Sequence, residues 1–199
     1  MTTDVEYGEQ QSLLDPPTDD HDHPDFGRYN APDEPLAPGF PDDDVLPRPI
    51  NWNLLTSEEA QAEWLDLNAW VNWLRATYGL PPTVIPPFWH RHDELIWELS
   101  ALHQHWLNSY DPDGSPAAPL AWHRDFADAR NRLREWVGTS GTRLDRDRPT
   151  RQTTWPGELP AQPAVERVVA DRDADFVDFV LADVTARQHI EQRVRAHLP

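Results

Sequence analysis

The sequence predicts an all-α protein: a small, Trp-rich bundle of about three core helices, followed by a long C-terminal helix and preceded by a disordered acidic arm. Three observations support this fold class. Nine of the ten tryptophans lie between Trp52 and Trp136. Apolar residues in that region recur at spacings of three and four, which is the period of one helix face. Residues 1–49 hold nine prolines and 13 acidic residues against two arginines, so they lack the apolar surface that would offset the entropy cost of ordering.

The first core helix is expected over residues 57–78. Thr56 and Glu59 have the spacing of a capping box at its start. Gly79, followed closely by two prolines, is expected to end it. The buried face is predicted to hold the apolar residues at helical spacing, which are Ala60, Trp64, Leu67, Val71, Leu74 and Tyr78.

Two further core helices are expected over residues 93–109 and 120–137. Apolar side chains follow the helical period along both segments. The stretch 111–119 between them is rich in Pro, Gly and Asp, which is typical of a loop. Gly138 and Gly141 are expected to end the last core helix.

Four regions are therefore predicted along the chain. They are a disordered, acidic, Pro-rich arm (1–49), a Trp-rich helical domain (50–141), an Arg/Pro-rich linker (142–163) and a C-terminal helix (164–199). The apolar side of the C-terminal helix requires a cover. That cover is either the Trp-rich bundle or another chain, and the second option would make the protein a homo-oligomer.

The composition excludes several classes of enzyme. The chain has no cysteine, which removes thiol nucleophiles and thiolate metal sites, and no lysine, which removes Schiff-base chemistry. The glycines form no phosphate-binding motif, and we expect no cofactor. We see no leader sequence or membrane span, so we expect a cytoplasmic protein. The net charge of −18 argues against direct binding to nucleic acid, because the phosphates would be repelled.

Histidine is the main candidate for catalysis. A site assembled from His92, Glu98 and His123 across helices is one hypothesis, and it would suit a metal- or histidine-dependent hydrolase. The alternative is a buried hydrogen-bonded set in which His92 caps the second core helix, with Glu98 or the arginines of the third core helix as partners. We favour the alternative and predict no metal site, because no HExxH motif and no Glu-x-x-His pair falls on an expected helix.

Aromatic residues outside the bundle suggest contacts with another protein. We therefore favour a non-catalytic, helical adaptor as the function. The alternative is an acidic mimic of DNA that occupies a nucleic-acid-binding protein. The candidate partner-binding residues are Phe26, Tyr29 and Phe40 in the arm, Trp155 in the linker, and Phe176 and Phe179 in the C-terminal helix.

A series of short motifs runs from Trp52 to Gly141. The most specific are Trp70-Val71-x-Trp73-Leu74, Ile85-Pro86-Pro87-x-Trp89-x-x-His92, Glu98-Leu99-Ser100-Ala101-Leu102, Trp122-His123 and Arg132-Leu133-Arg134-Glu135-Trp136. This stretch resembles a family of actinobacterial proteins known only as a domain of unknown function. The family has cysteine where this chain has Phe88 and Thr142, so a role for those thiols does not apply. The resemblance implies an accessory role for a protein encoded on plasmids, conjugative elements or phages. It identifies no catalytic residue.

Overall fold

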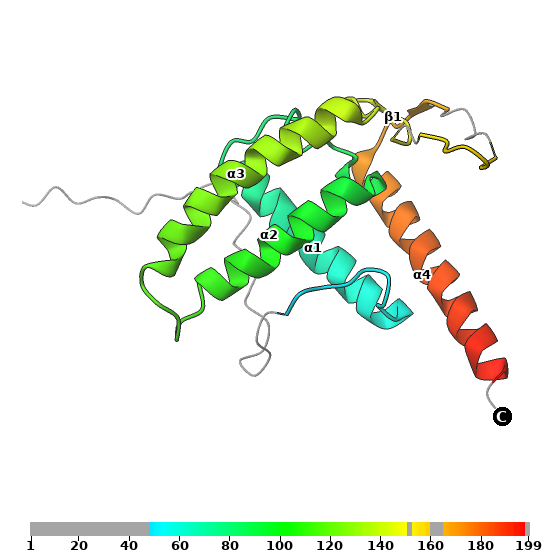
Figure 1. The fold of residues 1–199 in the computed structure, drawn as a ribbon, viewed down its shortest axis with the longest axis horizontal. Coiled ribbons are helices and arrows are strands. Elements are labelled where there is room, and N and C mark those ends of the chain that lie inside the picture. The colour runs from blue at the N-terminus through cyan, green and yellow to red at the C-terminus, as the bar shows by residue number, and fades with distance from the viewer. Residues whose placement is uncertain (1–47, 151–152, 160–164, 198–199) are drawn as a thin grey trace, which may run out of the picture. The chain divides into compact units, whose positions relative to one another are not determined.

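A computed structural model describes residues 48–150, 153–159 and 165–197, all of which belong to one compact unit that spans residues 35–199. The predictions for the arm, including Phe26, Tyr29 and Phe40, lie outside the described residues. The described part is helical apart from its loops and one very short sheet, so the predicted all-α fold class is confirmed (Figure 1). Its elements are α1 (Ser57–Thr77), the 3-10 turn η1 (Trp89–Arg91), α2 (Asp93–Ser109), α3 (Ala118–Thr139), β1 (Arg146–Asp147), β2 (Arg167–Val168) and α4 (Arg172–Ala196).

Local sequence sets the helix ends close to where they were expected. At the start of α1, the Thr56 hydroxyl accepts a hydrogen bond from the backbone N–H of Glu59, and the Glu59 carboxylate accepts one from the backbone N–H of Thr56. Gly79 follows α1 at a φ of 58°, where a residue with a side chain would be strained. Helix α3 is longer than predicted: it begins at Ala118, has a proline in its first turn, and continues through Gly138.

The helices pack as two antiparallel pairs. Helices α2 and α3 are joined by a short loop and lie side by side (Figure 1). Helix α4 packs on α1, with its ends fixed by polar contacts. Glu191 near its C-terminal end accepts hydrogen bonds from Ser57, whereas Arg172 at its start donates to Asn68.

Aromatic side chains form most of the core, and α4 contributes to it. The Phe176 ring centroid lies 6.3 Å from that of Trp89 and 6.4 Å from that of Trp64. Of the two covers left open for the C-terminal helix, the structure therefore shows packing on the bundle. Burying rings of this size supplies much of the hydrophobic stabilisation. Six of the ten tryptophans are buried: Trp52, Trp64, Trp70, Trp89, Trp106 and Trp122.

The stretch expected to be a linker contains β1, which pairs with β2 in an antiparallel sheet. Arg146 lies opposite Val168, and Asp147 lies opposite Arg167. Strands of two residues produce no alternating pattern, which is why the sequence did not predict them. Among the described residues, no helix is both long and apolar enough to cross a bilayer.

Candidate functional site

Two buried histidines lie on either side of Arg91, and each contacts a carboxylate from a later part of the chain. His90 and Arg91 contact Asp175 of α4, and we call these three residues the α4 anchor. His92, the residue after η1, contacts Asp147 of β1. Together with Thr150 and Glu94, these two residues form what we call the β1 anchor. The short turn η1 thus holds two distant segments against the bundle.

The α4 anchor is a neutral imidazole beside an ion pair. His90 Nε2 lies 2.9 Å from Asp175 Oδ2, and the Arg91 guanidinium donates to both oxygens of that carboxylate. Burial lowers the pKa of His90 to about 4, although Asp175 acts in the opposite direction. The imidazole is therefore neutral at pH 7. Burial tends to raise the pKa of Asp175, but hydrogen bonds from Arg91 and His90 outweigh it and lower that pKa.

The rest of the His90 environment is apolar. The rings of Phe176 and Phe179 each lie 5.3 Å from the imidazole, centroid to centroid. His90 Nδ1 is buried and has no hydrogen-bond partner among the described residues. His90 therefore combines aromatic neighbours with a polar contact to Asp175.

The His92 side chain does not cap α2, and its partners are not Glu98 or the α3 arginines, which corrects that expectation. The β1 anchor instead engages both nitrogens of this histidine. His92 Nε2 lies 2.8 Å from Asp147 Oδ1, and Nδ1 lies 2.9 Å from Thr150 Oγ1. The Thr150 hydroxyl donates to Glu94 Oε1 at 2.6 Å. A hydroxyl, an imidazole and a carboxylate are the parts of a nucleophilic triad. Here, however, the hydroxyl proton is directed to Glu94, so the contacts attach the β1 segment to the start of α2 and do not activate Thr150.

The structure separates the three residues of the predicted hydrolase site. Glu98 accepts hydrogen bonds from Arg132 of α3, the shorter at 2.7 Å. His123 Nδ1 lies 2.8 Å from the carbonyl oxygen of Pro119, and Nε2 lies 3.0 Å from the Tyr78 hydroxyl. His92 belongs neither to the Glu98 contacts nor to the His123 contacts. It precedes α2, whereas His123 lies near the start of α3.

The antiparallel packing of α2 and α3 explains this separation. The start of α3 lies beside the end of α2, where the Trp122 indole N–H reaches the carbonyl oxygen of Leu102 at 3.5 Å. Leu102 is ten residues after His92, which corresponds to about 15 Å along a helix. In the described part of the chain, no group of three or more His, Cys, Asp or Glu side chains has the arrangement of a metal site.

Two of the predicted partner-binding residues lie inside the molecule. Phe176 is 4% exposed and packs in the core, which corrects its prediction as a contact for another protein. Phe179 is half-buried, and its ring lies 5.4 Å from that of Trp64 and beneath the Arg91 guanidinium. Sequence reasoning missed His90 and Asp175 in this arrangement. The available signal was an acidic residue directly before Phe176 on a helix with one apolar face.

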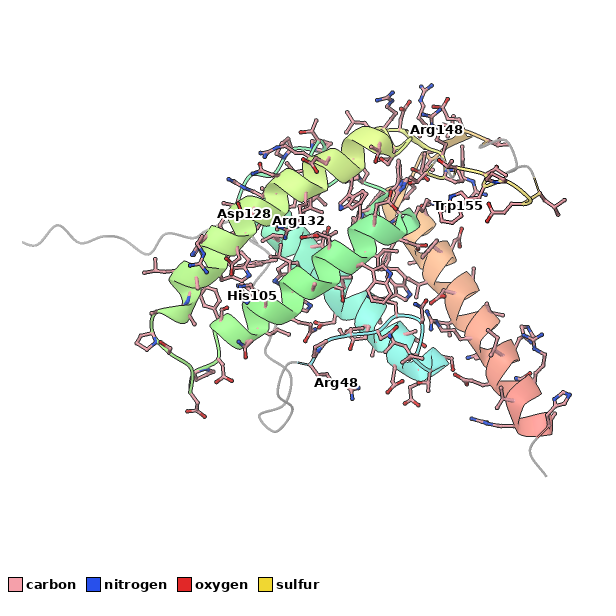
Figure 2. The ribbon with its side chains drawn as sticks, in the orientation of Figure 1. Arg48, His105, Asp128, Arg132, Arg148 and Trp155 are labelled. Carbon is pink, nitrogen blue, oxygen red and sulfur yellow. The ribbon has the colours of Figure 1, made fainter. Side chains whose placement is uncertain are left out.

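Trp155 is the predicted partner residue that remains on the surface. It is 70% exposed, the highest value among the ten tryptophans, and it lies in the stretch between β1 and β2 (Figure 2). Leu144, Val165 and Val168 around the same sheet are 69–77% exposed. We call these four residues the β1–β2 patch.

A hollow adjoins the β1–β2 patch at Leu144. Its volume is about 490 Å³, and Pro86, Pro87 and Val169 also line it. Of the four residues of the patch, Leu144 is the one that lines this hollow.

Comparison with known proteins identified no matching family model, no matching curated protein and no matching solved structure. The resemblance to the actinobacterial family of unknown function therefore stays a prediction.

Proposed function

We propose that the protein is a non-catalytic adaptor that binds another protein through the β1–β2 patch. The observation that carries this proposal is the exposure of Trp155, in a molecule that buries most of its other tryptophans. A large apolar side chain in water is costly, whereas the same side chain buried at an interface is among the strongest contributors to binding.

The neighbouring side chains support an extended contact around Trp155. Val165 and Val168 are 77% and 73% exposed, and Leu144 also lines the hollow beside η1, whose lining includes Arg75 and Arg172. Single exposed apolar residues are normal on protein surfaces, but several in one segment are typical of a binding site.

Charge indicates the kind of surface that would fit. Arg143 and Arg148 flank β1, and neither forms an ion pair within the described part of the chain. An interface of this type commonly combines an apolar centre with a charged rim. We therefore expect the partner to present an apolar face that is bordered by acidic residues.

The test is affinity capture from a lysate of the source organism, after nuclease treatment, with the full chain as bait. The informative variant is Trp155→Ala, and the matched control is Leu120→Ala. Leu120 is 75% exposed but belongs to the first turn of α3, away from the sheet. We expect one near-stoichiometric protein with the native chain and with the control, reduced at least about tenfold by Trp155→Ala.

The captured protein is then purified and titrated against the three chains by calorimetry. Equal affinity for the native chain and for Trp155→Ala would remove the patch from the interaction. Failure of the native chain to retain any protein would contradict the adaptor function itself.

A further inference from the structure

The hollow beside η1 has walls from four separate parts of the chain. They are the C-terminal part of α1, the proline-rich stretch 80–89, Leu144 before β1, and the start of α4 with the residues just before it. We call this space the Arg75 hollow, after the arginine of α1 that lines it. Its volume of about 490 Å³ is within the range of roughly 300–1,000 Å³ that is typical of small-molecule sites.

Arg172 at the start of α4 holds the walls of the Arg75 hollow together. Its Nε donates to the carbonyl oxygen of Pro87 at 3.4 Å, and its Nη2 donates to Asn68 Oδ1 of α1 at 2.6 Å. Its Nη1 donates to Asp173 at 2.6 Å. One side chain therefore joins α4 to two of the other walls. A ligand would enter a space whose walls are already fixed, which keeps the entropy cost of binding low.

The lining of the Arg75 hollow carries a positive charge that the chain itself does not pair. Arg75 is exposed and forms no ion pair within the described part of the chain. The two other charged residues of the lining, Arg172 and Asp173, pair with each other. One negative charge on a ligand would balance the lining. A polyanion fits less well, because the chain as a whole has a net charge of −18 and would repel it.

The other lining residues indicate what should accompany that negative charge. Asn72 lies one turn before Arg75 on the same side of α1, and its amide can also donate. Pro82, Ile85 and Pro86 supply apolar surface. Because a guanidinium matches the planar geometry of a carboxylate with two parallel hydrogen bonds, a carboxylate suits Arg75 well.

We infer that the Arg75 hollow binds a small organic acid with one carboxylate. The carboxylate pairs with Arg75, and the apolar part of the molecule lies against the prolines and Ile85. This is a small-molecule site, and it does not rest on the proposed binding of another protein by the β1–β2 patch.

Titration of the full chain with phenylacetate tests the inference, followed by two-dimensional ¹H–¹⁵N NMR at pH 7 and constant ionic strength. We expect saturable shifts of the backbone N–H signals of Leu80 and Val169, which both line the hollow, with a Kd on the order of 1 mM. Phenylacetamide has nearly the same shape without the charge and should bind about fivefold more weakly. Phenethylammonium, with the opposite charge, should bind more weakly still.

Substitution of Arg75 assigns the contact to this side chain. Arg75→Gln should bind phenylacetate no better than the native chain binds phenylacetamide, whereas Arg75→Lys should retain part of the difference because it keeps the charge. Arg134→Gln is the control, since Arg134 is exposed on α3 and is not part of the hollow. Arg75 is itself exposed, so we expect every variant to fold, and circular dichroism checks the helix content.

Three results would each overturn the inference. The first is the absence of saturable shifts at the hollow up to about 20 mM phenylacetate. The second is equal affinity for phenylacetate and phenylacetamide, and the third is equal affinity of Arg75→Gln and Arg134→Gln for phenylacetate. None of them bears on the capture experiment with Trp155→Ala, so failure of this inference and failure of the adaptor function are distinguishable.

Discussion

The two anchors on either side of Arg91 hold their segments by different means. In the α4 anchor, a neutral His90 and a charged Arg91 share one carboxylate, and aromatic rings pack against the imidazole. In the β1 anchor, His92 contacts a carboxylate with one nitrogen and a hydroxyl with the other. His90 has one nitrogen without a partner among the described residues, whereas both nitrogens of His92 are engaged.

The two anchors also hold segments of very different size. The α4 anchor fixes a helix of 25 residues whose buried face belongs to the core. The β1 anchor fixes two-residue strands and the exposed stretch that contains Trp155. Loss of the first should therefore destabilise the whole unit, whereas loss of the second should release the β1–β2 patch and leave the bundle folded.

Of the substitutions proposed here, Asp175→Ala should lower the free energy of unfolding most. This change leaves the Arg91 guanidinium and the buried His90 without their shared acceptor. Removing one member of a fully buried ion pair costs about 3–5 kcal/mol, and because this pair is partly buried we expect a loss near the lower end of that range. Urea unfolding followed by tryptophan fluorescence measures the loss. The control is Asp178→Ala, in the next turn of α4 and exposed, which should change the free energy of unfolding by less than about 0.5 kcal/mol. Similar losses for the two variants would rule out the α4 anchor as a main source of stability.

Acidification should also destabilise the protein through His90. Burial lowers its pKa in the folded state from 6.5 to about 4. Between those values the unfolded chain binds a proton at this residue and the folded chain does not. The free energy of unfolding therefore falls as the pH drops, by about 2 kcal/mol from this residue between pH 7 and pH 5. His103, which stacks on Trp70, has its pKa lowered to about 4 by burial and adds a loss of the same sign.

The contribution of His90 can be isolated with His90→Gln. The glutamine amide does not titrate in this range, so the stability of this variant should depend less steeply on pH than that of the native chain. His105→Gln is the control, since His105 is about one-third exposed and contacts Asp125 near the surface. Urea midpoints at several values between pH 5 and pH 7 measure both slopes. An unchanged slope in His90→Gln would show that this residue is not held neutral by the fold.

The smallest effect on global stability is expected from Asp147→Ala. The change removes one of the two His92 contacts, for an expected loss of about 1–2 kcal/mol, confined mainly to the β1 segment. Asp145→Ala is the control, because Asp145 is exposed and its side chain pairs with the adjacent Arg146. Limited proteolysis should cleave residues 143–168 sooner in Asp147→Ala than in the control. Equal protection of the two variants would contradict the assigned role of Asp147.

The helices were predictable because their signals are local. The capping box at Thr56 and Glu59 and the glycine at position 79 determine the ends of α1 without reference to the rest of the chain. Helix α2 occupies the predicted residues 93–109 for a similar reason, with regular apolar spacing between two loops. In these segments local propensity and tertiary packing agree.

The anchors were not predictable because each joins residues far apart in the sequence. Asp147 lies 55 residues after His92, and Asp175 lies 85 residues after His90. No periodic pattern marks such pairs. His92 was singled out from the sequence, but its partners are Asp147 and Thr150 and not the ones expected. Its neighbour His90, whose pKa burial lowers to about 4, was missed. The exposure of Trp155 was expected, since it is the one tryptophan outside the Trp-rich region.

The most direct test of the two-anchor account is hydrogen exchange by mass spectrometry on the native chain, Asp147→Ala and Asp175→Ala at pH 7. We predict that Asp147→Ala exchanges faster only in peptides from residues 143–150 and 165–169, where the backbone N–H of Val169 donates to Asp145. Asp175→Ala should exchange faster throughout α4 and in the α1 residues packed against it. The same pattern of faster exchange in both variants would contradict the account, because it would make the two anchors parts of one cooperative element.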